Sequence, residues 1–210
     1  MTGWKTFVAG KSQEVKLDDP ISELIVKRLG ADLPILFLNK SPQEKTEYVM
    51  NALSRLGKEQ GFRSMAKGIS DDLKNEGFKK AEWLYDLHWY QEIEPTCYRM
   101  IRLPLVVESE WDWIRDAERK KKVAIGEGTP DVFGEIKWDF QKLLVANAEL
   151  RLMIFQERIE ISSDVLNTYF RETIDGYKNL EDGSKFLFIA FEKNGFNYTE
   201  KIKGRLNPCQ

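Results

Sequence analysis

The sequence has few of the residues that build disulfide frameworks and soft-metal sites. Its 210 residues include 2 cysteines, Cys97 and Cys209, and a single histidine, His88. Two cysteines without metal-ligand spacing define neither a disulfide framework nor a zinc site. One histidine excludes histidine-rich metal centres, and it excludes most Ser-His-acid arrangements unless His88 itself serves.

Long apolar runs and a charge excess of one sign are also absent. No run approaches the roughly 20 residues that a membrane helix needs, and the first residues lack the apolar core of a signal peptide. We therefore expect a cytoplasmic protein that has no membrane partner. A formal net charge of -2 argues against a uniformly basic nucleic-acid binder, though not against local basic patches.

What the chain does contain is material for one packed core. It has 6 Trp, 7 Tyr and 12 Phe, and its many charged residues are of both signs. The sequence predicts a single α/β domain over residues 41–210, with residues 1–40 as an N-terminal extension packed on it.

Helix signals are clearest in the first third of the chain. Residues 19–30 begin with an Asp-Pro N-cap and first-turn pair and end with glycine, which predicts a helix. Residues 41–44 form a capping box that opens a second helix, ending at Gly57 or Gly61. Between them, residues 33–38 are predicted to be a short extended piece.

From residue 62 onward, short runs of β-forming residues alternate with helical patterns. A hairpin followed by a helical crossover predicts a mixed central β-sheet flanked by helices. The expected elements are strands at 62–66, 81–91, 97–111, 152–155 and 185–191, a turn or short helix at 70–78, a long loop at 112–134, and helices at 136–148 and 163–180.

Three acidic residues lie in the first two of the longer strands. Asp86 is enclosed in an aromatic run, and Glu108 and Glu110 end the next strand. Carboxylates are costly to bury unless they bind a metal, share a proton or meet a cation. Side chains alternate across a strand, so Glu108 and Glu110 share a face, where Asp86 can join them if the strands are neighbours. Three such oxygen ligands suit a hard cation such as Mg²⁺.

This element order and placement of acids resemble the core of the PD-(D/E)XK nucleases, the restriction-endonuclease-like fold, over roughly residues 41–157. The resemblance implies that Asp86 and Glu108 match the Asp and Glu that bind one or two Mg²⁺ ions in that family. The family's lysine, which positions the attacking water, would follow Glu108 by two residues. Glu110 stands there instead, so the strict motif is broken.

In this superfamily the lysine can also come from the following helix. Lys142 is the best candidate, because it lies three residues after Asp139 and therefore on the same helix face. Lys137 is a second option. If Lys142 takes this role, we expect its ammonium within several ångströms of Glu108 and Glu110.

The resemblance implies hydrolysis of phosphodiester bonds in nucleic acid, DNA in the first place, by a nuclease of a bacterial defence or DNA-processing system. Mg²⁺ or Mn²⁺ would be the cofactor, with Asp86, Glu108 and Glu110 as ligands. Glu110 could alternatively orient the attacking water. The basic run Lys120, Lys121 and Lys122 could contact the phosphate backbone, or simply be solvated. The sequence leaves open whether the protein forms a homodimer or a larger complex.

The alternative hypothesis is a catalytically degenerate nuclease-like fold that binds nucleic acid or protein. Asp86 could be a buried acid bonded to the backbone or to Arg99 or Arg102. Glu108 and Glu110 could be a solvated strand edge, and Asp139 with Lys142 a surface ion pair.

Two further features carry open interpretations. His88 could support Asp86 or be a core histidine, and Trp111 and Trp113 could be core or stack on a base. The letters PD and ExK in residues 130–137 are a coincidence, because Asp131 and Glu135 are too close for two paired strands.

Overall fold

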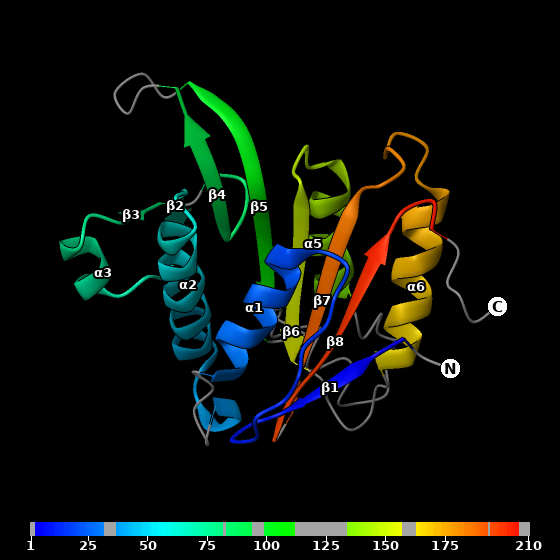
Figure 1. The fold of residues 1–210 in the computed structure, drawn as a ribbon, viewed down its shortest axis with the longest axis horizontal. Helices are drawn as coiled ribbons and strands as arrows, with labels where there is room; N and C mark the ends of the chain where they lie inside the picture. The colour runs from blue at the N-terminus through cyan, green and yellow to red at the C-terminus, as the bar shows by residue number, and fades with distance from the viewer. Residues whose placement is uncertain are drawn as a thin grey trace, which may run out of the picture.

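The structure, a computed structural model, describes residues 3–31, 37–81, 83–93, 99–111, 134–156, 163–192 and 194–205. It is an α/β fold with one mixed sheet of eight strands in the order β1-β8-β7-β6-β5-β4-β2-β3 (Figure 1). The strands are β1 (Lys5–Val8), β2 (Arg63–Ala66), β3 (Lys79–Lys80), β4 (Leu87–Glu92), β5 (Met100–Glu110), β6 (Leu150–Gln156), β7 (Lys185–Glu192) and β8 (Gly195–Ile202). The helices are α1 (Pro20–Ala31), the 3-10 turn η1 (Phe37–Asn39), α2 (Pro42–Glu59), α3 (Asp71–Asn75), α5 (Gly134–Val145) and α6 (Ser163–Gly176).

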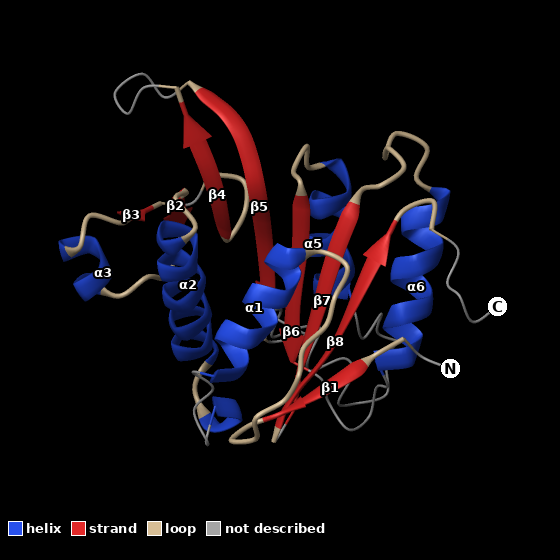
Figure 2. Ribbon diagram, viewed as in Figure 1, coloured by secondary structure: helices blue, strands red, loops and turns tan. Residues whose placement is uncertain are grey.

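Helices cover both faces of the sheet. Two hydrophobic clusters divide the core, one under α1 and α2 and the other under α5 and α6. Consecutive residues of β5 alternate between them: Leu105 and Val107 belong to the first, and Val106 belongs to the second. Figure 2 shows the sheet running from the short strands β2 and β3 on the left to β1 on the lower right. The predicted mixed sheet flanked by helices is confirmed.

Strand directions follow from the connections. Strands β2, β4 and β5 are antiparallel neighbours, and β5 leads through α5 to the parallel strand β6. The predicted hairpin and helical crossover are thus both confirmed. The β4–β5 hairpin extends beyond β6, whose pairing with β5 begins only at Leu105 (Figure 1).

Local signals placed the first helices correctly. The Asp19 carboxylate accepts the Ser22 N–H at 2.9 Å and caps α1. At α2, the Ser41 hydroxyl accepts the Glu44 N–H at 3.2 Å, while the Glu44 carboxylate accepts the Ser41 N–H at 2.8 Å. This reciprocal pair is the predicted capping box.

The structure differs from the sequence prediction at several short segments. Strand β4 begins at Leu87, so residues 83–86 precede the strand rather than belong to it. Strands β1, β3 and β8 were not predicted. β1 and β3 are short edge strands, which depend on pairing with another segment rather than on a local pattern, and β8 forms a hairpin with β7. Residues 37–39 form a 3-10 turn rather than an extended piece, and α5 and α6 end at Val145 and Gly176, earlier than expected.

No helix in the described parts of the chain is long and apolar enough to cross a membrane. The predicted loop at 112–134, apart from residue 134, lies outside the described residues.

Candidate active site

Asp86 lies directly before β4 and is only 3% exposed. Its carboxylate accepts two hydrogen bonds from Ser109, one from the backbone N–H at 2.9 Å and one from the hydroxyl at 2.8 Å. Its other carboxylate oxygen forms an ion pair with the ammonium of Lys67. Asp86 is therefore buried but well compensated.

The sheet register explains why these residues meet. Ala66 pairs with Leu87, and Leu87 pairs with Val107. One step further along the same antiparallel rows, Lys67, Asp86 and Glu108 fall side by side. The Lys67 N–H donates to the Asp86 carbonyl at 2.9 Å, which continues the β2–β4 ladder to that row.

Glu108 is a strongly perturbed acid at the centre of the site. It is 1% exposed, and its Oε1 atom has no hydrogen-bond partner among the described residues. Burial, followed by the negative charges of Asp86 and Asp139, raises its pKa to about 8, against the partial compensation from Lys142. A buried carboxyl with an unsatisfied oxygen and two acidic neighbours suits a cation, because an added positive charge would lower this cost.

Helix α5 brings the remaining pair of side chains to Glu108. Lys142 contacts Asp139 at 2.8 Å and Glu108 at 3.3 Å. Burial lowers the pKa of Lys142, but the hydrogen bond to Asp139 and the charge of Glu108 outweigh it and raise the pKa overall. The expected proximity of Lys142 to Glu108 is confirmed, whereas its proximity to Glu110 stays a prediction.

The ion pair of Asp139 and Lys142 is present, but it is not a plain surface pair, because Asp139 is 7% exposed and Lys142 also contacts Glu108. Helix geometry allows this because Phe140 and Leu143, on the neighbouring face, fill the core against β6 and β7. Lys137 points elsewhere: its ammonium lies 4.9 Å from the ring centre of Tyr169 on α6.

Two residues of this site were missed by sequence reasoning. Lys67 follows a four-residue strand. Ser109 lies between Glu108 and Glu110 in β5, at a position of opposite parity to theirs. No local pattern marks either one as a site residue. The signal that could have found Lys67 was its position directly after the predicted strand at 62–66. Once β2 and β4 pair, the residue at that position lies level with Asp86.

The other predicted residues have mixed outcomes. Glu110 is 3% exposed, so the interpretation of a solvated strand edge is wrong for it and for Glu108. Trp111 packs against Phe37 and Phe191 and is 5% exposed, which makes it a core residue and not a base-stacking one. Lys120, Lys121, Lys122 and Trp113 lie outside the described residues.

His88 lies two residues after Asp86 and is 1% exposed. Its ring packs between Trp83 and Tyr90, with centroid distances of 5.3 Å and 5.5 Å. Burial lowers its pKa to about 4, so the imidazole is neutral at pH 7. Arg102, considered as a partner of Asp86, instead binds Glu149.

The site thus combines three buried carboxyl groups and two partly exposed lysine side chains in a row between β2 and α5. These are the carboxyl groups of Asp86, Glu108 and Asp139 and the ammonium groups of Lys67 and Lys142. Within the described residues, no group of three His, Cys, Asp or Glu side chains converges closely enough to form a ready metal cluster. Such a row can hold a phosphate beside a cation, because it offers both carboxylate oxygens and positive charges.

Comparisons with protein families, characterised proteins and solved structures find no match to this chain.

Proposed function

We propose that the protein is a metal-dependent nuclease that hydrolyses phosphodiester bonds with Mg²⁺ or Mn²⁺, built on a restriction-endonuclease-like core. The observation that carries this proposal is the row of Asp86 and Glu108 across β4 and β5, completed by Lys142 from α5. The order of β2, β4, β5, α5 and β6 supports it, because a hairpin followed by a helical crossover is what the resemblance implied.

The donor set fits a hard divalent cation. Asp86, Glu108 and Glu110 would hold it through carboxylate oxygens, the ligand type that Mg²⁺ prefers. The Glu108 Oε1 atom, buried without a hydrogen-bond partner among the described residues, is the oxygen that gains most from a cation. Asp139 is an additional candidate ligand, since its charge already acts on Glu108. Bound there, the cation would polarise the scissile phosphate and lower the pKa of a bound water.

The protein's own residues would then bind and orient the substrate. Lys142 is fixed by contacts with Asp139 and Glu108, so its positive charge stands ready for the negative charge that develops on the phosphate. Lys67 holds Asp86 from the other side, and the two Ser109 hydrogen bonds fix the direction of that carboxylate. Glu110, at the position where the family has its lysine, would act either as the third ligand or as the group that orients the attacking water.

Cleavage assays with isosteric variants test the assignment. We expect the wild-type protein to cut plasmid or single-stranded DNA in Mg²⁺ or Mn²⁺, and Asp86→Asn and Glu108→Gln to lose at least about 100-fold in rate, because each removes a carboxylate ligand. Absent cleavage, or equal cleavage by the variants, would overturn the enzyme assignment. Retained DNA binding without cleavage would then favour the degenerate binding module.

Lys142 provides a sharper test, because the chain offers a matched control on the same helix. Lys142→Met removes the ammonium and keeps the aliphatic stem, so we expect the cleavage rate to fall by about 100-fold with little change in DNA affinity. Lys137→Met removes the same charge from the side of α5 that faces Tyr169 and should stay within about threefold of the wild type. Single-turnover kinetics measure both, and equal rates for the two variants would exclude Lys142 from the reaction.

A further inference from the structure

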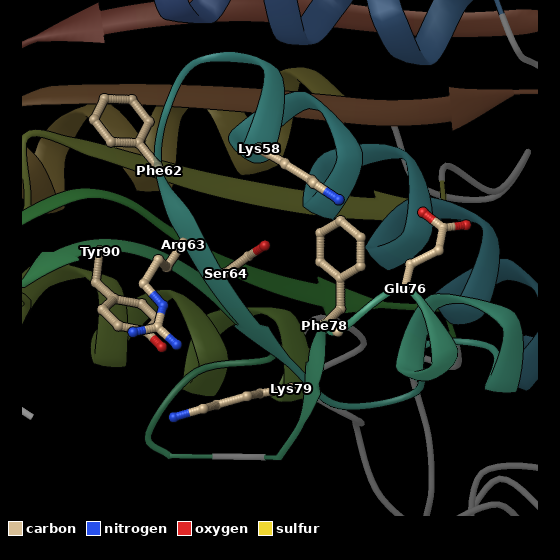
Figure 3. A pocket seen from close by; sticks show the side chains of 9 residues that line it. Lys58, Phe62, Arg63, Ser64, Glu76, Phe78, Lys79 and Tyr90 are labelled. Atoms are coloured by element: carbon tan, nitrogen blue, oxygen red, sulfur yellow. The ribbon is translucent and has the colours of Figure 1, made fainter. Parts of the chain in front are cut away.

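A small pocket opens at the edge of the sheet beside β2. It lies away from the row of Asp86, Glu108 and Asp139, called the acidic row below. Its volume is about 170 Å³. Three aromatic and three basic side chains dominate its lining: Phe62, Phe78, Tyr90, Lys58, Arg63 and Lys79. Figure 3 shows Lys58 and Phe78 on one side, Arg63 and Tyr90 on the other, and Ser64 between them.

The pocket exists because β3 covers only part of β2. The two strands pair only at Met65 and Ala66, so the first half of β2 is left beside the loop that leads into β3. Gly77 turns this loop with a φ of 88°, a left-handed value that favours glycine. The Phe78 N–H then bonds to the Leu73 carbonyl at 3.0 Å, which fixes the backbone at Phe78.

Positive charges lie close to the aromatic faces of this pocket. The Lys58 ammonium is 5.1 Å from the centre of the Phe78 ring, and the Arg63 guanidinium is 5.7 Å from the centre of the Tyr90 ring. One acid, Glu76, also lines the pocket, and it forms an ion pair with Arg55 at 3.2 Å. The Arg63 guanidinium also pairs with Glu92 at 2.7 Å, although Glu92 is not among the lining residues. The lining itself is basic and aromatic, the combination that binds bases by stacking and phosphates by charge.

The pocket and the acidic row share strand β2. Arg63 and Lys67 have the same parity and lie four residues apart, roughly 13 Å at the usual rise of a strand. A nucleic-acid strand covers that distance in about four base steps. One strand could therefore occupy the pocket and reach Asp86 at the same time.

We propose that this pocket binds one unpaired nucleotide of the nucleic-acid strand whose backbone reaches the acidic row. The base stacks on Phe78, and the adjoining phosphate contacts Lys79. The volume is well below the roughly 300–1,000 Å³ of sites for drug-sized ligands, which fits one base and not a base pair. The proposal rests on the proposed function for the role of the acidic row, but the binding itself needs no cleavage.

Fluorescence anisotropy with a labelled single-stranded 12-mer in a chelator tests the pocket separately from the reaction. We expect Phe78→Leu to weaken binding at least about fivefold, because leucine keeps an apolar contact but offers no stacking face. Phe78→Tyr keeps the face and should remain within twofold of the wild type. Equal affinities of wild type and Phe78→Leu, with both folded by circular dichroism, would overturn the proposal.

The two lysines of β3 give a matched pair for the charge. Lys79 lines the pocket, and the adjacent Lys80, which is exposed, is not among its lining residues. Lys79→Ala should lower affinity and reduce the slope of log K against log salt by about 0.7, as one lost phosphate contact does for single strands. Lys80→Ala should change the slope less. Identical losses of affinity and slope in the two variants would indicate a diffuse charge effect and would overturn the proposed nucleotide pocket.

Two further binding experiments distinguish an unpaired nucleotide of a strand from other ligands of the pocket. A duplex of the same sequence should bind more weakly than the single strand, and equal or tighter duplex binding would contradict an unpaired nucleotide. Free dTMP should compete only at concentrations far above the Kd of the 12-mer, and tight dTMP binding would point to a site for free nucleotides instead. If pocket variants lose binding while no cleavage is ever seen, the pocket stands and the nuclease assignment fails.

Discussion

At the scale of single residues, Glu108 keeps its proton in the folded protein at pH values where the unfolded chain has lost it. Its pKa is about 8 in the folded protein against 4.5 for an ordinary glutamate. The folded state therefore keeps a proton that the unfolded state loses between these pH values. The free energy of unfolding consequently falls as pH rises from about 4.5 to 8, by on the order of a few kcal/mol for this one group.

We expect Glu108→Gln to remove this dependence. Without metal, urea unfolding of the wild type should show a stability that declines from pH 6.5 to 8.5, whereas the variant should stay level and become the more stable protein at pH 8.5. Below pH 6.5 the buried His88, with its pKa lowered to about 4, acts in the opposite direction, so the comparison belongs above that pH. Adding Mn²⁺ should restore the wild type's stability at pH 8.5 and leave Glu108→Gln unchanged.

The control is Glu172→Gln, at an exposed position of α6, which should follow the wild type at every pH. A wild type whose stability rises from pH 6.5 to 8.5 without metal would contradict the raised pKa of Glu108.

At the scale of elements, helix α2 is positioned by its contact with β4 at a glycine. A Cβ added at Gly57 would lie 2.6 Å from the Trp89 Nε1 atom. The Trp89 ring is fully buried and its N–H donates to the Leu53 carbonyl at 3.0 Å, so the ring cannot move aside. The close approach of α2 to the sheet thus requires the absence of a side chain at this position.

Gly57→Ala is therefore expected to destabilise the protein, although alanine is the better helix former by about 1 kcal/mol. The overlap with Trp89 should outweigh this gain and cost roughly 1–3 kcal/mol net. Chemical denaturation measures the change, and Gly176→Ala is the control, since a Cβ there meets nothing within 4 Å. A Gly57→Ala protein as stable as the wild type would mean that α2 can shift away from β4.

At the scale of the whole molecule, one edge of the sheet is formed by a strand from the start of the chain. β1 pairs with β8, and the Phe7 ring stacks on Phe196 at 5.1 Å. Gly30 of α1 leaves room for this ring, because a Cβ there would lie 2.3 Å from it. β1 and α1 therefore fit together over the edge of the sheet, on the face that α2 also covers.

Phe7→Ala should accordingly cost about 3–5 kcal/mol, the range for a buried phenylalanine. Hydrogen exchange should show the loss first at β1 and β8 and least at β5, β6 and β7, which lie farther from β1 in the sheet. Val8→Ala, on the same strand but only partly buried, serves as the milder control. Uniform loss of protection in all strands would instead indicate that the edge and the centre unfold as one unit.

The sequence alone determined the features whose causes lie within a few residues. The capping box at Ser41 and the Asp-Pro start at residue 19 predicted helices at the right places, because capping bonds join residues three apart. The apolar runs predicted the central strands β5, β6 and β7 for the same local reason. Asp86 and Glu108 could be singled out because a carboxylate in an apolar run of sequence needs a partner, whatever that partner is.

The tertiary structure decided which side chains meet at those carboxylates. Lys67 reaches Asp86 only through the pairing of β2 with β4, and Ser109 reaches it only through the register of β4 with β5. Lys142 contacts Glu108 because the crossover of α5 places one face of that helix over β5. Strand β1 likewise joins the sheet by pairing with residues of β8 about 190 positions away, as the hydrogen bond between Thr6 and Asn197 illustrates. Such contacts depend on the summed burial of the whole core, which no short segment of sequence contains.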